Sequence, residues 1–388
     1  MLARYLVCAS NKAYPEDVTS SETQSTKTRR SRAQSVRHTD DRVLGALERL
    51  VSRGGWDAVT AAGVAREAGL SVGAVYSRAE SISELANQAW TRSIGLDFFS
   101  HIADIVNASR CGDAAVFDEE IIRFDRWAVT ASPAVELAIA SFFNDELDEV
   151  VGQSLRDGLD QIIWSKGQTR HESACATLVL SYFCGRAMAR CRLTSMPDVD
   201  KPGRVVLQSF WTSPAEEFTE EDHAGIEFLR PTVSELGDSI SQHVIEVLGQ
   251  YGYRRATVSR IARRAGLTPG AVLPSGSTKA ALVASAAVEL VMSPLEVWES
   301  FVDRSGRDTT GTARARFVRG IVRPEHEQMR RVNLELARIA ESVAEFVAFR
   351  APRDVLQQTH QGLMFVACFT SGLHDLPYLG PFRAGSAT

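Results

Sequence analysis

Apolar residues recur every three or four positions along most of this chain, which is the spacing of amphipathic helices. The first clear stripe comprises Val43, Leu44, Leu47, Leu50 and Val51. Asp40 or Asp41 is placed to cap that helix, and the pair Gly54-Gly55 is placed to end it. The same period dominates residues 91–195 and much of 291–388, so the pattern predicts an all-α protein.

Two short helices joined by a tight turn are predicted between residues 59 and 85. Thr60 can cap the first helix, and Gly69 can end it because glycine adopts the left-handed conformation readily. Ser71 can cap the second helix, where Gly73 and Ala74 allow close helix contact. This pattern is typical of a helix-turn-helix, whose second helix enters the DNA major groove.

The same pattern occurs a second time in the chain. A shift of 197 positions lays residues 41–85 on residues 238–282 without a gap. The caps, the turn and the apolar stripe all match, with identical pairs that include Thr60/Thr257, Gly69/Gly266 and Val75/Val272. A gapless match of this kind indicates an internal duplication.

These residues resemble the DNA-binding head of TetR-family transcriptional regulators. The first copy reads G-G-W and then T-x-x-x-V-A-x-x-A-G-L-S-x-G-x-V-Y, and the second reads Y-G-Y and then T-V-S-R-I-A-R-R-A-G-L-T-P-G-A-V. The resemblance implies two TetR-like units, each with a three-helix head on a helical regulatory body. Family members normally act as homodimers, whereas here two units are fused in one chain.

We expect six segments along the chain, divided by changes in composition and by the repeat. They are an unstructured basic arm (1–39), a first head (40–90), a first body for ligand binding and dimerisation (91–195), a linker (196–236), a partly degenerate second head (237–290) and a second body (291–388). Within the first body, Ser132-Pro133 predicts a helix restart, and a long helix should follow as far as Trp164. In the second body we expect helices over 312–322, 324–349 and 353–373.

The first head carries the predicted sequence-reading side chains. Tyr76 resembles the family's phosphate-contacting tyrosine, while Ser71, Val72, Ser77 and Arg78 are placed to meet base edges or backbone. The family's aromatic residue near position 79 and its lysine near position 82 are both missing here.

A basic cluster precedes the first head without an acidic residue among its members: Lys27, Arg29, Arg30, Arg32 and Arg37. One interpretation is a solvated tail, and the other is an arm that follows phosphates or enters the minor groove. Its position directly before the head favours the arm.

The second head is more basic than the first, but its recognition helix is poorer. Pro274 should stop that helix early, and Leu273 replaces the tyrosine. Lys279 falls where the family has its phosphate-binding lysine. We therefore predict that the first head, including its cap Thr60, reads sequence. The second head should mainly hold phosphates through Thr257, Arg260, Thr268 and Lys279.

The resemblance implies a small-molecule pocket in the body. Aromatic residues along the first body are our candidates for its lining: Phe124, Trp127, Phe142, Phe143 and Tyr182. The alternative is that they are ordinary core, because stripes of large apolar side chains commonly fill helical cores.

Composition narrows the classes of function further. A net charge of -5 excludes a general polyanion-coating protein, so DNA binding must rest on local basic patches. Six scattered cysteines without C-x-x-C pairs favour reduced thiols in the cytoplasm, with a redox sensor as the alternative. The sequence has no long apolar run, so we expect no membrane span. It also has no phosphate-binding glycine loop and no H-E-x-x-H motif, so we do not expect an enzyme, a bound metal or a cofactor.

The sequence thus predicts a sequence-specific DNA-binding transcriptional regulator, a repressor released by a small-molecule effector. Its partner would be a double-stranded DNA operator, bound by a single chain as a pseudo-dimer. Because the heads differ, that operator need not be palindromic. A homodimer of the fused chain is an open alternative for its assembly. A second function class is a TetR-like helical ligand- or protein-binding module without operator recognition.

Overall fold

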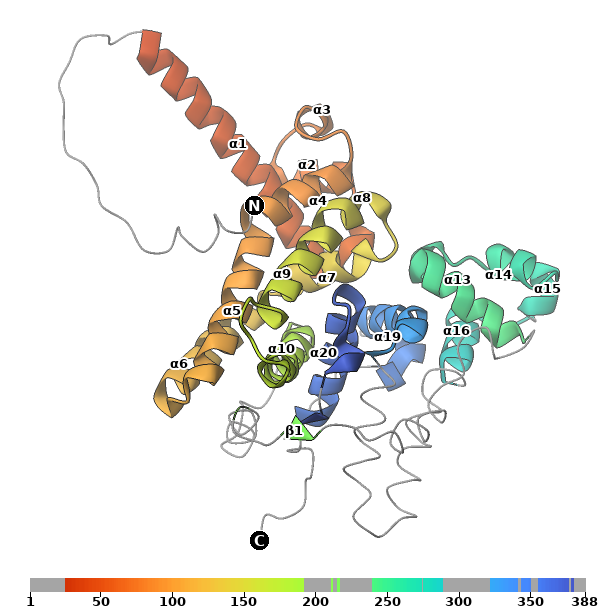
Figure 1. Ribbon diagram of the computed structural model, residues 1–388. Coiled ribbons are helices and arrows are strands. Elements are labelled where there is room, and N and C mark those ends of the chain that lie inside the picture. Colours follow the sequence, from red (N-terminus) through yellow and green to blue (C-terminus); the bar gives the residue numbers. More distant parts are fainter. Residues whose placement is uncertain are drawn as a thin grey trace. The chain divides into compact units, whose positions relative to one another are not determined.

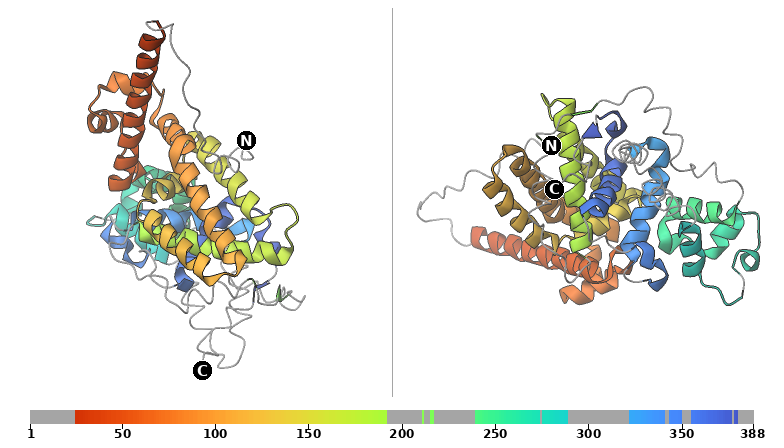
Figure 2. Two further views of the ribbon diagram at one scale, coloured as in Figure 1. Left: turned by 90° about the vertical axis from the view of Figure 1, so that its left-hand side faces the viewer. Right: turned by 90° about the horizontal axis from the view of Figure 1, so that it is seen from below.

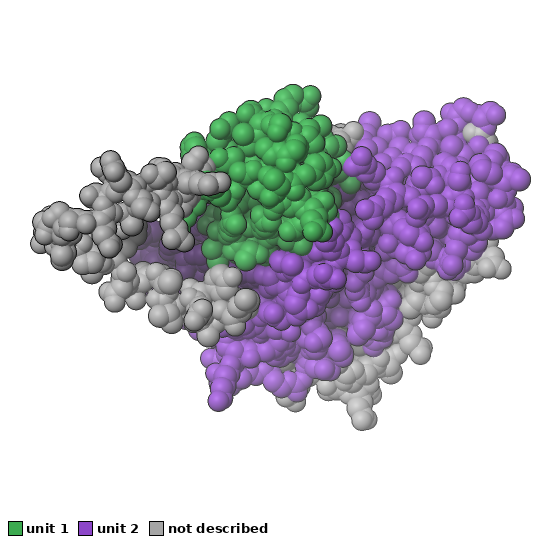
Figure 3. Space-filling model, turned by 90° about the horizontal axis from the view of Figure 1, so that it is seen from above, with its two compact units in different colours: residues 1–98 green, residues 99–388 purple. Residues whose placement is uncertain are grey.

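The computed structural model places most of the described chain in helices (Figures 1 and 2). The chain divides into two compact units, residues 1–98 and 99–388, which Figure 3 colours separately. Strand pairing among the described residues is limited to β1 (Ala215–Glu216) against β2 (Tyr378–Leu379), so the all-α class is confirmed. The structure describes residues 25–191, 211, 215–216, 239–273, 275–288, 322–340, 343–349, 355–376 and 378–379.

The first unit is a helical head that contains a hook of two short helices. Its elements are α1 (Ser25–Gly54), the 3-10 turn η2 (Trp56–Ala58), α2 (Ala61–Ala68), α3 (Val72–Tyr76), α4 (Ile82–Ala89) and the π-helical turn η3 (Trp90–Ile94). Its core is closed by buried side chains from all four α-helices, among them Leu47, Val64, Val75 and Leu85. Burial of each such side chain contributes about 1.5–3 kcal/mol to the free energy of unfolding.

Helix α1 begins earlier than the sequence predicted. The expected lack of structure over residues 1–39 is wrong for residues 25–39, which continue the helix backbone. The stretch contains neither glycine nor proline, so nothing in it breaks the helix before Val43. Asp40 and Asp41 therefore lie inside α1 and cap nothing, which corrects the predicted start.

The second unit starts within α5 and contains the first helical body. That body comprises α5 (Gly95–Cys111), α6 (Ala114–Ala128), α7 (Ser132–Ser141), α8 (Asp145–Leu147), the π-helical turn η4 (Asp148–Gly152), α9 (Gln153–Ile163) and α10 (Arg170–Arg190). The restart at Ser132-Pro133 is confirmed, since Pro133 stands at the start of α7. Residues 173–189 of α10 are buried on all sides, which makes α10 the central helix of this body.

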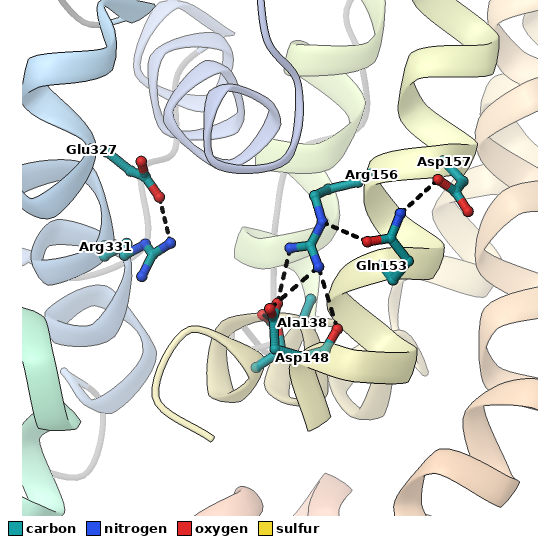
Figure 4. A network of polar contacts seen from close by, with 8 residues as sticks. Ala138, Asp148, Gln153, Arg156, Asp157, Glu327 and Arg331 are labelled. Atoms are coloured by element: carbon teal, nitrogen blue, oxygen red, sulfur yellow. Dashed lines mark hydrogen bonds and ion pairs between the residues drawn. The ribbon is translucent and has the colours of Figure 1, made fainter. Parts of the chain in front are cut away.

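The predicted single helix from Val135 to Trp164 is wrong. The chain turns at Phe142 and Phe143, and the side chain of Asn144 then accepts the Leu147 N–H at 3.2 Å and caps α8. Farther along, Arg156 on α9 donates to Asp148 at 2.9 Å and to Gln153 at 3.2 Å, which ties α9 to the π-helical turn (Figure 4).

The second head and the second body also belong to the second unit. The head comprises α13 (Ile240–Arg255), α14 (Val258–Arg264), α15 (Pro269–Val272) and α16 (Lys279–Ala287). The described part of the body comprises η7 (Pro324–His326), α19 (Glu327–Ile339), η8 (Ala344–Phe349), α20 (Val355–Phe369) and η9 (Leu373–Asp375). Leu248 and Val283 of the head share one hydrophobic cluster with Leu336 of α19 and Phe346 of η8.

Two predictions for this region change and two lie outside the described residues. The helix expected over 324–349 is wrong as one element, because α19 ends at Ile339 and a separate 3-10 turn follows. The helix expected over 353–373 is present as the shorter α20. The helix expected over 312–322 and most of the 196–236 linker fall outside the described residues.

Helices α10 and α20 lie side by side in both Figures 1 and 2. A Cβ added at Gly185 would overlap the carbonyl oxygen of Gln358, and one added at Gly362 would overlap the carbonyl oxygen of Ser181. Each glycine therefore meets the residue that stands four positions before the other glycine. Such a reciprocal contact is what a two-fold axis produces between identical subunits, and here it joins the two halves of one chain.

The distance along the chain between hook and crossing differs in the two halves. Gly69 and Gly185 are separated by 116 residues, whereas Gly266 and Gly362 are separated by 96. The second half is thus 20 residues shorter between its turn glycine and its crossing glycine, which explains why a shift of 197 aligns the heads but not these helices.

Candidate nucleic-acid interface

The first hook, residues 60–77, folds as its cap residues predict. The Thr60 hydroxyl accepts the Gly63 N–H at 3.1 Å, and the Ser71 hydroxyl accepts the Ala74 N–H at 3.2 Å. Gly69 ends α2 at φ 64°, a left-handed conformation that glycine tolerates best. These local interactions fix the angle between α2 and α3.

One side of α3 is exposed and carries several hydrogen-bonding groups. Tyr76 is 54% exposed and Val72 is 41% exposed, while Val75 is buried and holds the helix to the core. Ser71 and Ser77 are exposed at the two ends of the same helix. A phenol, two hydroxyls and an apolar side chain can contact phosphates, base edges and thymine methyl groups. Four of the predicted contact residues thus share one accessible surface.

Arg78 has partners inside the head. Its Nε donates to Asp40 Oδ1 of α1 at 2.7 Å, and its Nη1 donates to the Ala74 carbonyl at 2.6 Å. The Arg78 carbonyl in turn accepts from Gln88 Nε2 of α4 at 2.9 Å. Arg78 therefore joins the end of α3 to α1 and α4, and a contact with a base would require it to leave Asp40.

Other cations of the first head also bond within it. Arg42 donates to the Ala68 carbonyl at the end of α2 at 2.6 Å. Arg49 and Arg53 pair with Glu67 at 2.7 and 3.3 Å, and the Arg49 hydrogen bond holds the pKa of Glu67 below its usual value. These pairs attach α2 to α1. The helical backbone of α1 includes four of the predicted arm residues, Lys27, Arg29, Arg30 and Arg32. The structure describes their backbone but not their side chains.

The second hook, residues 257–273, repeats the geometry of the first. Thr257 caps α14 by accepting the Arg260 N–H, and Thr268 caps α15 by accepting the Ala271 N–H, both at 3.3 Å. Gly266 turns the chain at φ 65°. The early stop is also confirmed, because α15 ends at Val272 and Leu273 is extended, as the residue before a proline prefers.

The surface of the second hook offers less chemistry. The four residues of α15 read P-G-A-V, so Thr268 supplies the hydroxyl at its start and no polar side chain follows within the helix. Thr268 and residues 269–271 are exposed, so the hook is accessible. It presents mainly backbone and small apolar groups, which carry little sequence information.

Three basic residues of the second head have intramolecular partners. Arg264 pairs with Glu246 at 2.6 Å, and the guanidinium of Arg260 lies 4.4 Å from the centre of the Tyr251 ring. Lys279 Nζ donates to the Tyr253 carbonyl at 3.0 Å and lies 3.9 Å from the centre of the same tyrosine's ring. The lysine predicted to bind phosphate therefore also connects α16 to α13 through its contacts with Tyr253.

The five predicted ligand-binding aromatics form two separate groups. Phe124 lies 5.2 Å from Trp127 between ring centres, and Phe183 joins Phe124 to Tyr182 through contacts of 4.8 and 4.9 Å. The other group is at the end of α7, where Phe142 and Phe143 contact each other at 6.1 Å. The structure thus does not bring all five into one site.

Sequence reasoning missed a buried ion pair beside the first aromatic group. Arg186 of α10 donates to both carboxylate oxygens of Asp125 on α6, each at 2.5 Å, and its side chain is only 2% exposed. The signal was available, because Asp125 stands next to the buried Phe124 and Arg186 interrupts an apolar helix. A charged pair in this core can orient a polar ligand group or specify the packing of α6 on α10.

Two of the described cysteines, both on α10, have the properties of structural thiols. Cys175 and Cys184 are buried, and burial raises the pKa of Cys175 to about 12. A high pKa keeps the thiol protonated and unreactive at neutral pH. Among the described helices, none combines the length and apolar character that a membrane crossing requires.

Comparison with known proteins identifies both hooks. The model of "Bacterial regulatory proteins, tetR family" matches residues 43–89 and, separately, residues 245–286. No curated protein matches the chain. The matches run from within α1 to the end of α4 in the first head, and from within α13 into α16 in the second. Residues 43–89 and 245–286 are therefore each similar to the DNA-binding head of TetR-family regulators, which is consistent with two TetR-like units in one chain.

Proposed function

We propose that the protein is a sequence-specific repressor that binds an asymmetric operator as a single-chain pseudo-dimer. The reciprocal crossing of α10 and α20 at Gly185 and Gly362 is the observation that carries the proposal. Homodimers of regulators present two heads related by a two-fold axis. In this chain each half supplies one helix to the crossing and one hook, so a single chain has the parts that two subunits otherwise supply.

The two heads would divide the work of recognition. The first hook places Tyr76, Val72 and two serines on an exposed surface, which suits sequence readout together with phosphate contact. The second hook is accessible but carries few reading groups, which suits binding to the backbone. Half-sites bound by such a pair lie about one helical turn apart, roughly 34–36 Å, and need not match each other in sequence.

Release from DNA would follow binding of a small-molecule effector in the cytoplasm. The group of Phe124, Trp127 and Tyr182 beside the Asp125–Arg186 pair is our candidate for the effector site. An effector that binds one arrangement of the body better than another shifts the population toward it. If that arrangement spreads the heads beyond the spacing of successive grooves, the operator is released. No catalytic step is involved.

Selection of bound sequences from random duplexes, followed by footprinting and mass measurement of the complex, tests this proposal. We expect one asymmetric site and a complex that holds one chain of 42.4 kDa. A short palindromic site occupied by two chains would contradict the pseudo-dimer and would favour a homodimer of the fused chain. The repressor assignment is tested by transcription from the selected site with and without the protein.

A second candidate function is a helical ligand- or protein-binding module without operator recognition. It is favoured by the apolar α15 and by the intramolecular partners of Arg260, Arg264 and Lys279. Titration of duplex DNA at two salt concentrations separates the candidates. Weak binding that selects no sequence at either concentration would support the module.

A further inference from the structure

A buried charge network lies between α7 of the first body and α19 of the second. Arg338 of α19 donates through Nη1 to Glu136 Oε2 of α7 at 2.9 Å and through Nε to Glu335 Oε2 at 2.7 Å. The side chains of Arg338, Glu335 and Glu136 are 5%, 2% and 9% exposed. We call these three residues the anchor network.

The two glutamates occupy similar positions in the two halves of the chain. Each begins an E-L-A sequence, at residues 136–138 on α7 and at residues 335–337 on α19. The third position after each glutamate differs, since Ile139 stands in the first half and Arg338 in the second. Two carboxylates buried this close would repel each other, and Arg338 provides the positive charge that makes the arrangement stable.

Glu335 extends the network to the second head. Its Oε1 accepts the main-chain N–H of Tyr253 at 2.8 Å, at the corner that the kink at Gly252 makes near the end of α13. A Cβ added at the neighbouring Gly252 would lie 3.2 Å from the same oxygen and 3.1 Å from the Phe143 ring. Arg255 then donates to the Phe143 carbonyl at 3.1 Å. The corner of the head thus contacts both α19 and the end of α7.

Tyr253 connects this corner to the rest of the second head. Its carbonyl accepts from Lys279 at the start of α16, and its ring contacts Phe346 of η8 at 5.3 Å. The second hook follows directly after the corner, beginning at Thr257. The orientation of the corner therefore sets the direction in which α14 and α15 leave the body.

We propose that Arg338 is a positioning residue for DNA binding by the second head, and that α7 controls this head through the anchor network. The proposal rests on the proposed DNA-binding function for its consequence, but its structural part can be tested without DNA. A change in the packing of α7 would move Glu136 and Phe143, and both lead to the Gly252-Tyr253 corner. The regulation of the second head would then pass through a charge bridge that joins the two halves of the chain.

Hydrogen exchange on the full-length protein tests the structural part. In Arg338→Leu we expect exchange in residues 251–264 to rise at least tenfold, while α10 stays as protected as in the unchanged protein. Arg323→Leu is the control, because Arg323 lies just before α19 and its partly exposed side chain pairs with Glu325 at 3.5 Å. Unchanged protection of residues 251–264 in Arg338→Leu would overturn the proposal.

Two conservative variants cover the case in which Arg338→Leu fails to fold. Glu335→Gln keeps an oxygen for the Tyr253 N–H and should preserve protection of the corner within about twofold, whereas Glu335→Leu should lose it. Arg338→Lys keeps the charge but not the planar fork that reaches both carboxylates, so an intermediate rise is expected. Equal exchange in Glu335→Gln and Glu335→Leu would contradict the role given to this hydrogen bond.

Footprinting on the selected operator tests the consequence for DNA. Arg338→Leu should lose protection of the half-site of the second head at concentrations that still protect the half-site of the first. Loss of both half-sites together would contradict a role confined to the second head. If the unchanged protein selects no operator, the proposed function fails, and the exchange experiment still decides whether Arg338 positions the head.

Discussion

The two heads share one hook and differ in how the rest of the chain holds it. In both, a threonine caps the first short helix and a glycine with positive φ makes the turn. The first head has a core of its own within residues 1–98, whereas the second shares its hydrophobic cluster with α19 and η8. After a duplication, the few residues that shape the hook must stay, while the reading surface and the attachment are free to diverge.

The largest effect that sharpens this comparison is expected at Gly252. Both Gly252 and Gly55 have φ near 70° and ψ near 170°, a conformation that costs other residues about 1–3 kcal/mol. Gly252 is in addition close to Phe143 and Glu335, so Gly252→Ala should lose more stability than Gly55→Ala. Thermal unfolding measures the loss, and hydrogen exchange locates it. Gly55→Ala should loosen the first head alone; equal exchange maps for the two variants would break the comparison.

The next effect concerns sequence readout. Tyr76→Ala should weaken operator binding by about 10- to 100-fold, or about 1.4–2.7 kcal/mol, because its exposed phenol is placed for DNA. The matched change in the second head is Leu273→Ala, at the equivalent position, which should alter binding by less than threefold. Electrophoretic titration of the selected operator and of a scrambled duplex measures both. Equal losses of selectivity would contradict the asymmetry of the heads.

A smaller effect separates two roles for Arg78. If Arg78 serves mainly to join α3 to α1, then Asp40→Asn should weaken operator binding nearly as much as Arg78→Ala, by about 1 kcal/mol each. The pair is one-fifth to one-quarter exposed, so solvent screening keeps the expected effect modest. If Arg78 instead contacts a base, Asp40→Asn would free it and binding would stay equal or improve. A double-mutant cycle on operator affinity distinguishes the two.

The sequence predicted well those features that depend on residues close together along the chain, such as helix caps and turns. The caps Thr60 and Ser71, the turn glycine Gly69 and the stop before Pro274 all act within four residues, and each is confirmed. The early start of α1 was missed because Asp40 resembles a cap, while its partner Arg78 is 38 residues away.

The anchor network could not have been predicted in this way. Arg338 and Glu136 are 202 residues apart, and nothing in either local pattern indicates that α7 and α19 lie together. The crossing of α10 and α20 was hidden for a related reason, since the second half is shorter and the shift that aligns the heads does not align these helices. Contacts between the halves depend on the packing of the whole body.

The smallest effect tests the second head's contact with phosphate. Each lysine or arginine that neutralises a phosphate adds about one to the slope of log affinity against log salt. Lys279 is held by the Tyr253 carbonyl and ring, so Lys279→Ala should change this slope by less than about half a unit. Arg263 is exposed on α14 and is matched by Arg66 in the first head, so Arg263→Ala and Arg66→Ala are the natural controls. A full unit lost in Lys279→Ala would mean that the lysine leaves Tyr253 for the DNA. The corner that the anchor network holds would then loosen whenever the second head binds, and the two heads would be more alike than their contacts in the free protein indicate.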